Sequence, residues 1–159
     1  MIFVTLGSQK FQFNRLLKEL DKLVEQGLIK EDIFAQTGYS DYIPKNYKFK
    51  NFLDRDEFSK VMNECDKVIT HGGTGAIIGA VKKNKKVIAV PRNKKFNEHV
   101  DNHQYDIVDA FSRMKIIEGV FTVEQLGETI SSLEFTKLSN YVSNTEVLVK
   151  DIKRFLKQI

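Results

Sequence analysis

The chain has 159 residues, of which 42% are hydrophobic and 29% charged, a composition typical of a folded globular protein and not of a disordered one. The single cysteine, Cys65, excludes a disulfide framework and a cysteine-based zinc site, as expected for a reducing cytoplasm. The net charge of +4 is unevenly distributed, because seven lysines and arginines lie between Lys82 and Lys95. This cluster is either a solvated loop and helix end or an attractive field for anionic ligands or an anionic membrane surface. Phe96 alone adds an aromatic ring to it, so nucleic acid is not an expected partner.

Short apolar stretches alternate with longer segments of helical periodicity, a pattern typical of parallel strands joined by crossover helices. The predicted strands cover residues 2–6, 32–38, 47–53, 67–73, 85–91 and 114–119. The predicted helices cover residues 13–27, 55–65, 74–83 and 99–112, a segment that begins at Thr122, and residues 135–159. No apolar run reaches the roughly 18–20 residues of a membrane span, and the amino terminus lacks the basic region of a signal peptide. We therefore predict an α/β fold, a Rossmann-like parallel sheet with helices on both faces.

The helix ends carry recognisable signals. Gly27 is expected to end the first helix, Asp54 with Glu57 forms a capping box, and Thr122 with Gln125 caps a later helix. The last helix repeats its apolar residues at intervals of three and four, so it either packs on the domain or docks a partner. We divide the chain into a Rossmann-like domain, residues 1–134, and a carboxy-terminal amphipathic helix, residues 135–159.

Ligands of such sheets bind at the carboxyl ends of the strands. Small and hydrogen-bonding residues follow four of the predicted strands: Gly7 and Ser8, Thr37 and Gly38, the run His71-Gly72-Gly73-Thr74-Gly75, and Pro91 with Arg92. The run at 71–75 opens a helix, whose free N–H groups and dipole suit a diphosphate. The glycines admit phosphate oxygens to the backbone, while Thr74 and His71 can add hydrogen-bond donors.

Three kinds of nucleotide-binding site could account for the loop at residues 71–75. A Walker P-loop is excluded, because Ala76 and Ile77 stand where Lys and Ser/Thr are required. A dinucleotide site remains a rival, since "GTGAIIG" follows a strand and Arg92 lies where it could contact an NADP 2′-phosphate. A nucleotide-sugar site is favoured by the polar segment "HVDNHQ", which places His99, Asp101, Asn102, His103 and Gln104 at a helix start. His99 and His103 lack the intervening Glu of a zinc-binding H-E-x-x-H, so no metal is expected.

The stretches "MIFVTLGSQKFQFNRLL", "AQTGY", "VITHGGTGA" and "VIAVPRNKKFNEHVDNHQ" together resemble the donor-binding half of glycosyltransferase family 28. The resemblance covers about residues 1–115. It extends to small soluble subunits of split glycosyltransferases, both the bacterial capsule and exopolysaccharide proteins of the PssE type and the catalytic subunit of the eukaryotic two-subunit UDP-GlcNAc transferase. It implies one half of a GT-B glycosyltransferase, with the acceptor half on a separate, membrane-anchored protein.

The resemblance also implies roles for individual residues. It places the diphosphate on Gly72, Gly73, Thr74 and Gly75 beside His71, sugar hydroxyls near Asn102, His103 and Gln104, the Gly7-Ser8 loop at the interdomain cleft, and uracil near Thr37-Gly38 and Pro91-Arg92. Candidate catalytic residues are His71, His103 and Asp101; Glu98 is also available as a base, although related enzymes often draw it from the acceptor half. Gly79 stands where relatives carry a Glu that binds the ribose, which puts the ribose contacts in doubt.

The leading hypothesis is therefore an inverting hexosyltransferase subunit that uses a UDP-sugar to extend a lipid-linked saccharide in capsule or exopolysaccharide synthesis. It would act at the inner face of the plasma membrane through its partner, without a cofactor or metal. The capsule-like segment after Pro91 favours UDP-galactose, UDP-glucuronate or UDP-glucose, with UDP-GlcNAc still open. The alternatives are a non-catalytic nucleotide-sugar-binding subunit and an NADP-dependent reductase.

Overall fold

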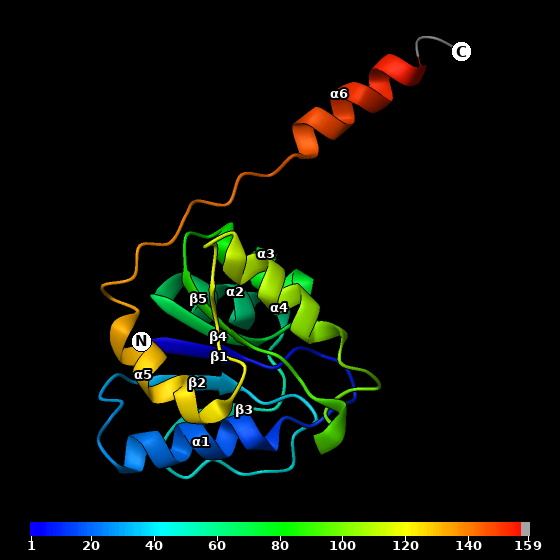
Figure 1. The fold of residues 1–159 in the computed structure, drawn as a ribbon. Coiled ribbons are helices and arrows are strands. Elements are labelled where there is room, and N and C mark those ends of the chain that lie inside the picture. The colour runs from blue at the N-terminus through cyan, green and yellow to red at the C-terminus, as the bar shows by residue number, and fades with distance from the viewer. Residues whose placement is uncertain (157–159) are drawn as a thin grey trace.

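The computed structural model describes residues 1–156 and contains a six-stranded, fully parallel sheet with the strand order β3-β2-β1-β4-β5-β6 (Figure 1). The strands are β1 (Ile2–Thr5), β2 (Ile33–Gln36), β3 (Lys48–Lys50), β4 (Lys67–His71), β5 (Lys86–Val90) and β6 (Glu118–Gly119). The helices are α1 (Asn14–Glu25), α2 (Arg55–Glu64), α3 (Thr74–Val81), α4 (His103–Arg113), α5 (Leu126–Ser132) and α6 (Thr145–Leu156), with short 3-10 turns η1 (Lys94–Phe96) and η2 (Val123–Gln125). The predicted Rossmann-like α/β fold is confirmed.

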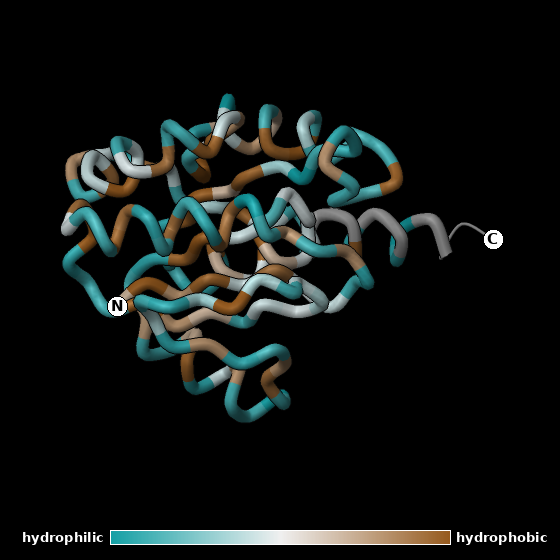
Figure 2. The backbone as a smooth tube through the Cα atoms, turned by 90° about the horizontal axis from the view of Figure 1, so that it is seen from below, coloured by the Kyte–Doolittle hydropathy of each residue, from teal (hydrophilic) through white to brown (hydrophobic). Residues whose placement is uncertain are grey.

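Alternate residues of the strands face two separate hydrophobic clusters, one on each side of the sheet. On one side the strands pack against α1, η2 and α5; on the other they pack against α2, α3 and α4. In Figure 1 these two helical layers lie on opposite sides of the sheet, and in Figure 2 the central strands carry much of the hydrophobic colour. The central strands β1 and β4 are buried throughout. β1 is accordingly apolar up to Thr5, whereas β4 buries Lys67, Thr70 and His71 together with two apolar residues.

Two of the three predicted helix ends are confirmed. Gly27 follows α1 with φ of 69°, and the N–H of Leu28 donates to the carbonyl of Leu23, as in a Schellman motif. Asp54 caps α2 through the expected capping box with Glu57. Thr122 instead precedes the 3-10 turn η2 and makes no side-chain cap. The helix predicted over 99–112 begins only at His103, so the first part of the "HVDNHQ" segment is a loop.

The tail differs from the predicted single helix over 135–159. Residues 135–144 form a non-helical strap, and α6 begins at Thr145; residues 157–159 lie outside the described part of the chain. Leu138 packs on one hydrophobic cluster and Tyr141 on the other, while the Ser139 N–H donates to the Lys115 carbonyl at 2.7 Å. Residues three apart share a face in a helix but point to opposite sides of an extended chain, so this pairing requires the strap to be extended.

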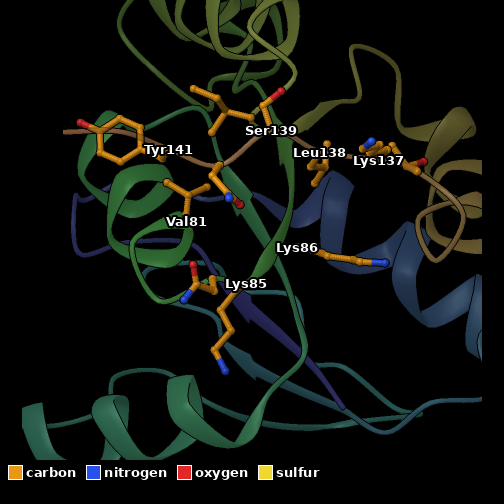
Figure 3. Close-up of a pocket in the computed structure, with 11 residues that line it drawn as sticks. Val81, Lys85, Lys86, Lys137, Leu138, Ser139 and Tyr141 are labelled. Carbon is orange, nitrogen blue, oxygen red and sulfur yellow. The ribbon is translucent and has the colours of Figure 1, made fainter. Parts of the chain in front are cut away.

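The strap lies at the amino edge of the sheet, over the end of α3 and the start of β5, where it borders a cavity of about 300 Å³. Figure 3 shows Tyr141 facing Val81 across this cavity, with Leu138 farther along the strap. Figure 1 shows α6 projecting from the end of the strap, away from the sheet. Within the described residues, no helix combines the length and apolar character needed to cross a membrane.

Candidate functional site

A cavity of about 510 Å³ opens at the carboxyl ends of β1 and β4. The connections from these two neighbouring strands run to opposite faces of the sheet, which makes the position between them the topological switch point where ligands of doubly wound folds bind. The cavity is lined by residues 7–9 after β1, residues 71–76 after β4, and His99, His103, Gln104 and Ile107 around the start of α4. It thereby collects all three histidines of the chain.

His71 is the last residue of β4 and is only 8% exposed. Its ring lies between two glycines: a Cβ at Gly7 would be 2.7 Å from Nε2, and one at Gly73 would be 2.2 Å from Cε1. Glycine is needed at position 72 for the close approach of α4, because a Cβ added there would lie 2.7 Å from the Cβ of Gln104. A Cβ at Gly75 would meet nothing within 4 Å. The glycine run therefore serves the packing of His71 and α4, and Gly75 alone lies beside open space that a ligand could occupy.

Gln104 fixes the proton of His71. Its Oε1 accepts the N–H groups of Gly72 at 2.9 Å and Arg92 at 3.1 Å, so its Nε2 must face His71 Nδ1, which lies 3.2 Å away. The amide N–H donates to Nδ1, and the imidazole proton therefore resides on Nε2. Burial, reinforced by the positive charge of Arg92, lowers the pKa of His71 to about 4. At neutral pH His71 is thus an uncharged donor that presents its N–H beside Gly7.

The first turn of α3 supplies further donors. Gly73 is its N-cap residue and makes no side-chain cap, and the first backbone bond of the helix runs from the Ile77 N–H to the Gly73 carbonyl. The preceding N–H groups of Thr74, Gly75 and Ala76 have no partner within the helix and lie at the positive end of its dipole. With His71 Nε2 they form a cluster of neutral donors at one end of the cavity, an arrangement suited to phosphate oxygens.

Six of the residues singled out from the sequence do not line this cavity: Thr37, Gly38, Pro91, Arg92, Asp101 and Asn102. Thr37 is 1% exposed, and Gly38 supports the first loop from behind, since its Cβ would lie 3.0 Å from the Gly7 carbonyl oxygen. Asn102 accepts the Lys94 N–H through Oδ1 at 2.9 Å. These side chains shape the loops around the cavity and do not enter it.

Arg92 has a structural position instead of the ligand contact expected for it. It is 1% exposed, and its Nη2 donates to the carbonyls of Leu6 at 2.7 Å and Phe11 at 3.4 Å, at the two ends of the loop after β1. Burial lowers its pKa to about 10, partly offset by the negative charge of Glu98. A buried guanidinium cannot reach the 2′-phosphate of NADP, which removes the main argument for a dinucleotide site.

Glu98 is also not free to act as a base. Its side chain is fully buried, and its two oxygens each accept an N–H of Arg15 at 2.9 Å. One of these oxygens also accepts the Asn93 N–H at 2.9 Å. Sequence reasoning missed Gln9 and Ile107 as residues of the cavity; His99, which belongs to the polar segment "HVDNHQ", also lines it. Among the side chains that the structure describes, no three His, Cys, Asp or Glu residues gather as ligands of a metal ion.

A family model, the glycosyltransferase family 28 C-terminal domain, matches residues 1–159. The chain belongs to this family. The subunit ALG13 of the UDP-N-acetylglucosamine transferase of Kluyveromyces lactis is 37% identical over 104 residues, which are 65% of this chain and 45% of that protein. The ALG13 subunit of Debaryomyces hansenii is 27% identical over 158 residues, 91% of this chain and 74% of that protein. The family 28 chain therefore spans less than half of the first of these relatives.

Solved structures confirm the fold of this family 28 chain. Acinetobacter baumannii MurG superimposes with a TM-score of 0.59 at 19% identity, over 84% of this chain and 40% of MurG. The glycosyltransferase SnogD of Streptomyces nogalater gives 0.59 at 19% identity, over 83% of this chain and 34% of SnogD. A solution structure of ALG13 gives 0.58 at 18% identity, over 89% of both chains. The chain thus has the fold of one half of a GT-B glycosyltransferase.

Proposed function

We propose that this family 28 chain is the donor-binding catalytic subunit of an inverting, UDP-sugar-dependent hexosyltransferase. The observation that carries the proposal is the set of neutral donors at the switch point, where the free N–H groups of α3 and the Nε2–H of His71 meet in one cavity. Departure of UDP from the sugar leaves new negative charge on the β-phosphate. Donors that are already in place stabilise that charge without reorganisation, and more strongly than water would.

The relatives suggest which donor to test first. Because the curated relatives are named as subunits of UDP-N-acetylglucosamine transferase, UDP-GlcNAc is the first candidate. The capsule-like sequence after Pro91 supports a role in capsule or exopolysaccharide synthesis, for which UDP-galactose, UDP-glucuronate and UDP-glucose are the rival donors. His103 and Gln104 lie at the cavity near the sugar in this proposal, although Gln104 is 4% exposed and already bonded through both ends of its amide.

A second protein completes the site in this proposal. The fold corresponds to one half of a GT-B enzyme, and the relatives are named as transferase subunits, which supports a partner that binds the acceptor. We propose that this partner is membrane-anchored, that it presents a lipid-linked saccharide, and that it holds the chain at the cytoplasmic face of the membrane.

Two measurements test the proposal. Calorimetric titration should show binding of UDP and UDP-GlcNAc but not of NADPH. His71→Asn should weaken UDP binding by about 10–100-fold, because a hydrogen bond to a charged group is worth about 1.5–3 kcal/mol. Val100→Ala is the matched control, since Val100 is 63% exposed and does not line the cavity. Binding of NADPH without UDP, or unchanged UDP affinity in His71→Asn, would contradict the assignment.

A further inference from the structure

His99 is a second histidine of the cavity, and its partner differs from that of His71. It lies in the loop between η1 and α4, its side chain is 16% exposed, and its ring packs against Phe11 at a centroid distance of 4.9 Å. Its Nδ1 lies 3.0 Å from Oδ1 of Asp101. The same carboxylate oxygen accepts the His103 N–H at 3.0 Å, which ties Asp101 to the first residue of α4.

The carboxylate determines which nitrogen of His99 carries the proton. The backbone N–H of His103, followed by the contact with His99, lowers the pKa of Asp101, so this carboxylate is ionised at neutral pH and can only accept. Nδ1 of His99 must therefore donate to it. The Asp101 N–H also approaches Nδ1, but at 3.4 Å, and the shorter, charge-assisted bond decides the tautomer. The lone pair of His99 Nε2 then remains, and none of the hydrogen bonds described for residues 1–156 uses it.

The two histidines thus have opposite functions set by their neighbours. Gln104 donates to His71 and leaves it with an Nε2–H, whereas Asp101 accepts from His99 and leaves it with a bare Nε2. One cavity then offers both a hydrogen-bond donor and a proton acceptor. When the surroundings give two titratable groups of one cavity opposite protonation patterns, the two groups are candidates for the proton donor and the proton acceptor of a reaction.

We propose that His99 is the general base of the transfer and that Asp101 is its positioning residue; this rests on the proposed function. In the transfer step, His99 Nε2 takes the proton of the acceptor hydroxyl while the oxygen of that hydroxyl forms a bond to the anomeric carbon of the donor sugar. The bond from that carbon to the β-phosphate oxygen breaks on the opposite side, and its electron pair leaves with UDP. Asp101 stabilises the imidazolium, and His99 returns the proton to water after the products leave.

The charges around His99 are compatible with this step. The Asp101 carboxylate faces Nδ1 of His99, and the ring of Phe11 beside the imidazole is uncharged. His71 is neutral at pH 7, and the positive charges of Arg92 and His99 both lower its pKa further, so a proton on His99 keeps His71 uncharged. His103 also lines the cavity, with its Nδ1 3.8 Å from Asp106.

The tautomers can be read on the isolated chain. Long-range ¹⁵N–¹H correlation of the histidine rings at neutral pH should show the proton of His99 on Nδ1 and that of His71 on Nε2. In Asp101→Asn the preference of His99 should weaken, while His71 stays unchanged. A wild-type His99 with its proton on Nε2 would overturn the proposal, whatever the chain catalyses.

Kinetics test the base directly, using radiolabelled UDP-GlcNAc and membranes of the source organism. His99→Gln should lower transfer by about 10²–10⁴-fold, keep the Kd for UDP and lose the acid limb of the pH profile. Asp101→Asn should lower transfer by at least about tenfold through the tautomer, and Val100→Ala should match the wild type. Wild-type transfer in His99→Gln would overturn the base assignment alone. A wild-type chain that binds no UDP, or that transfers no sugar from UDP-GlcNAc, UDP-galactose, UDP-glucuronate or UDP-glucose, would overturn the proposed function, and the base with it.

Discussion

Replacing Gln104 by Met should destabilise the protein by about 2–4 kcal/mol. Gln104 is 4% exposed, and its Oε1 is the acceptor for two backbone N–H groups, those of Gly72 and Arg92. Met has a similar volume but no acceptor, so both groups lose their partner, at about 1–3 kcal/mol each. The two losses together are about 2–6 kcal/mol. The apolar surface that Met buries offsets part of this sum, so the expected loss lies in the lower part of that range.

Urea unfolding followed by far-ultraviolet circular dichroism suits the measurement, because the chain has no tryptophan to report by fluorescence. Gln125→Met is the control, since Gln125 is exposed and an exposed substitution should change the free energy of unfolding by less than about 0.5 kcal/mol. The same small loss in Gln104→Met would refute the reasoning. It would mean that the two N–H groups find other partners and that Gln104 does not fix the His71 tautomer.

Three further outcomes are expected. Gly72→Ala should lose about 1–3 kcal/mol by overpacking against Gln104, whereas Gly75→Ala, in open space within α3, should gain about 0.5–1 kcal/mol; equal melting temperatures would contradict the packing described for the two glycines. Gly79→Glu should tighten UDP binding by about tenfold relative to Gly79→Gln, because the family resemblance implies a ribose-binding carboxylate at this position; equal Kd values in calorimetry would exclude that contact. His71 has a folded pKa of about 4 against 6.5, so its contribution is present above pH 6.5 and lost toward pH 4. Over that window the wild type should lose about 3 kcal/mol more than His71→Asn, and parallel unfolding curves against pH would contradict the shift.

The sheet can be predicted from the sequence because strands and helices leave periodic patterns within short stretches of the chain. Apolar runs, helix periodicity and capping residues such as Asp54 each depend on neighbouring residues. The central strands and the Asp54 capping box are confirmed, whereas the Thr122 cap is not. The edge strand differs from its prediction over 114–119: β6 has only two residues, Glu118–Gly119, because the buried Ile116 and Ile117 precede the ladder instead of pairing in it. A run of apolar residues does not say which of them make the hydrogen bonds.

The loops that form the cavity could be predicted, but the functions of their residues could not. Parallel strands bring Gly7 and His71 to one edge, as the topology requires. The orientation of the Gln104 amide cannot be predicted from the neighbouring sequence. It is set by the backbone N–H groups of Gly72 and Arg92, which belong to other loops. The position of Arg92 in the sequence and the family resemblance predict a ligand contact for it, whereas in the fold its side chain is buried and bonded to two carbonyls far away in the sequence.

The strap sets how far α6 can move from the folded core. Tyr141 is its last residue packed on a hydrophobic cluster, and residues 142–144 lead to the helix. Even fully stretched, the four residue steps from Tyr141 to Thr145 span at most about 14 Å, roughly the length of a strand of this sheet. The strap leaves from the amino edge, while the cavity lies at the carboxyl edge. A partner protein bound to α6 is therefore kept at high local concentration near this chain. To place residues in the cavity, it must extend around the side of the sheet from the amino edge to the carboxyl edge.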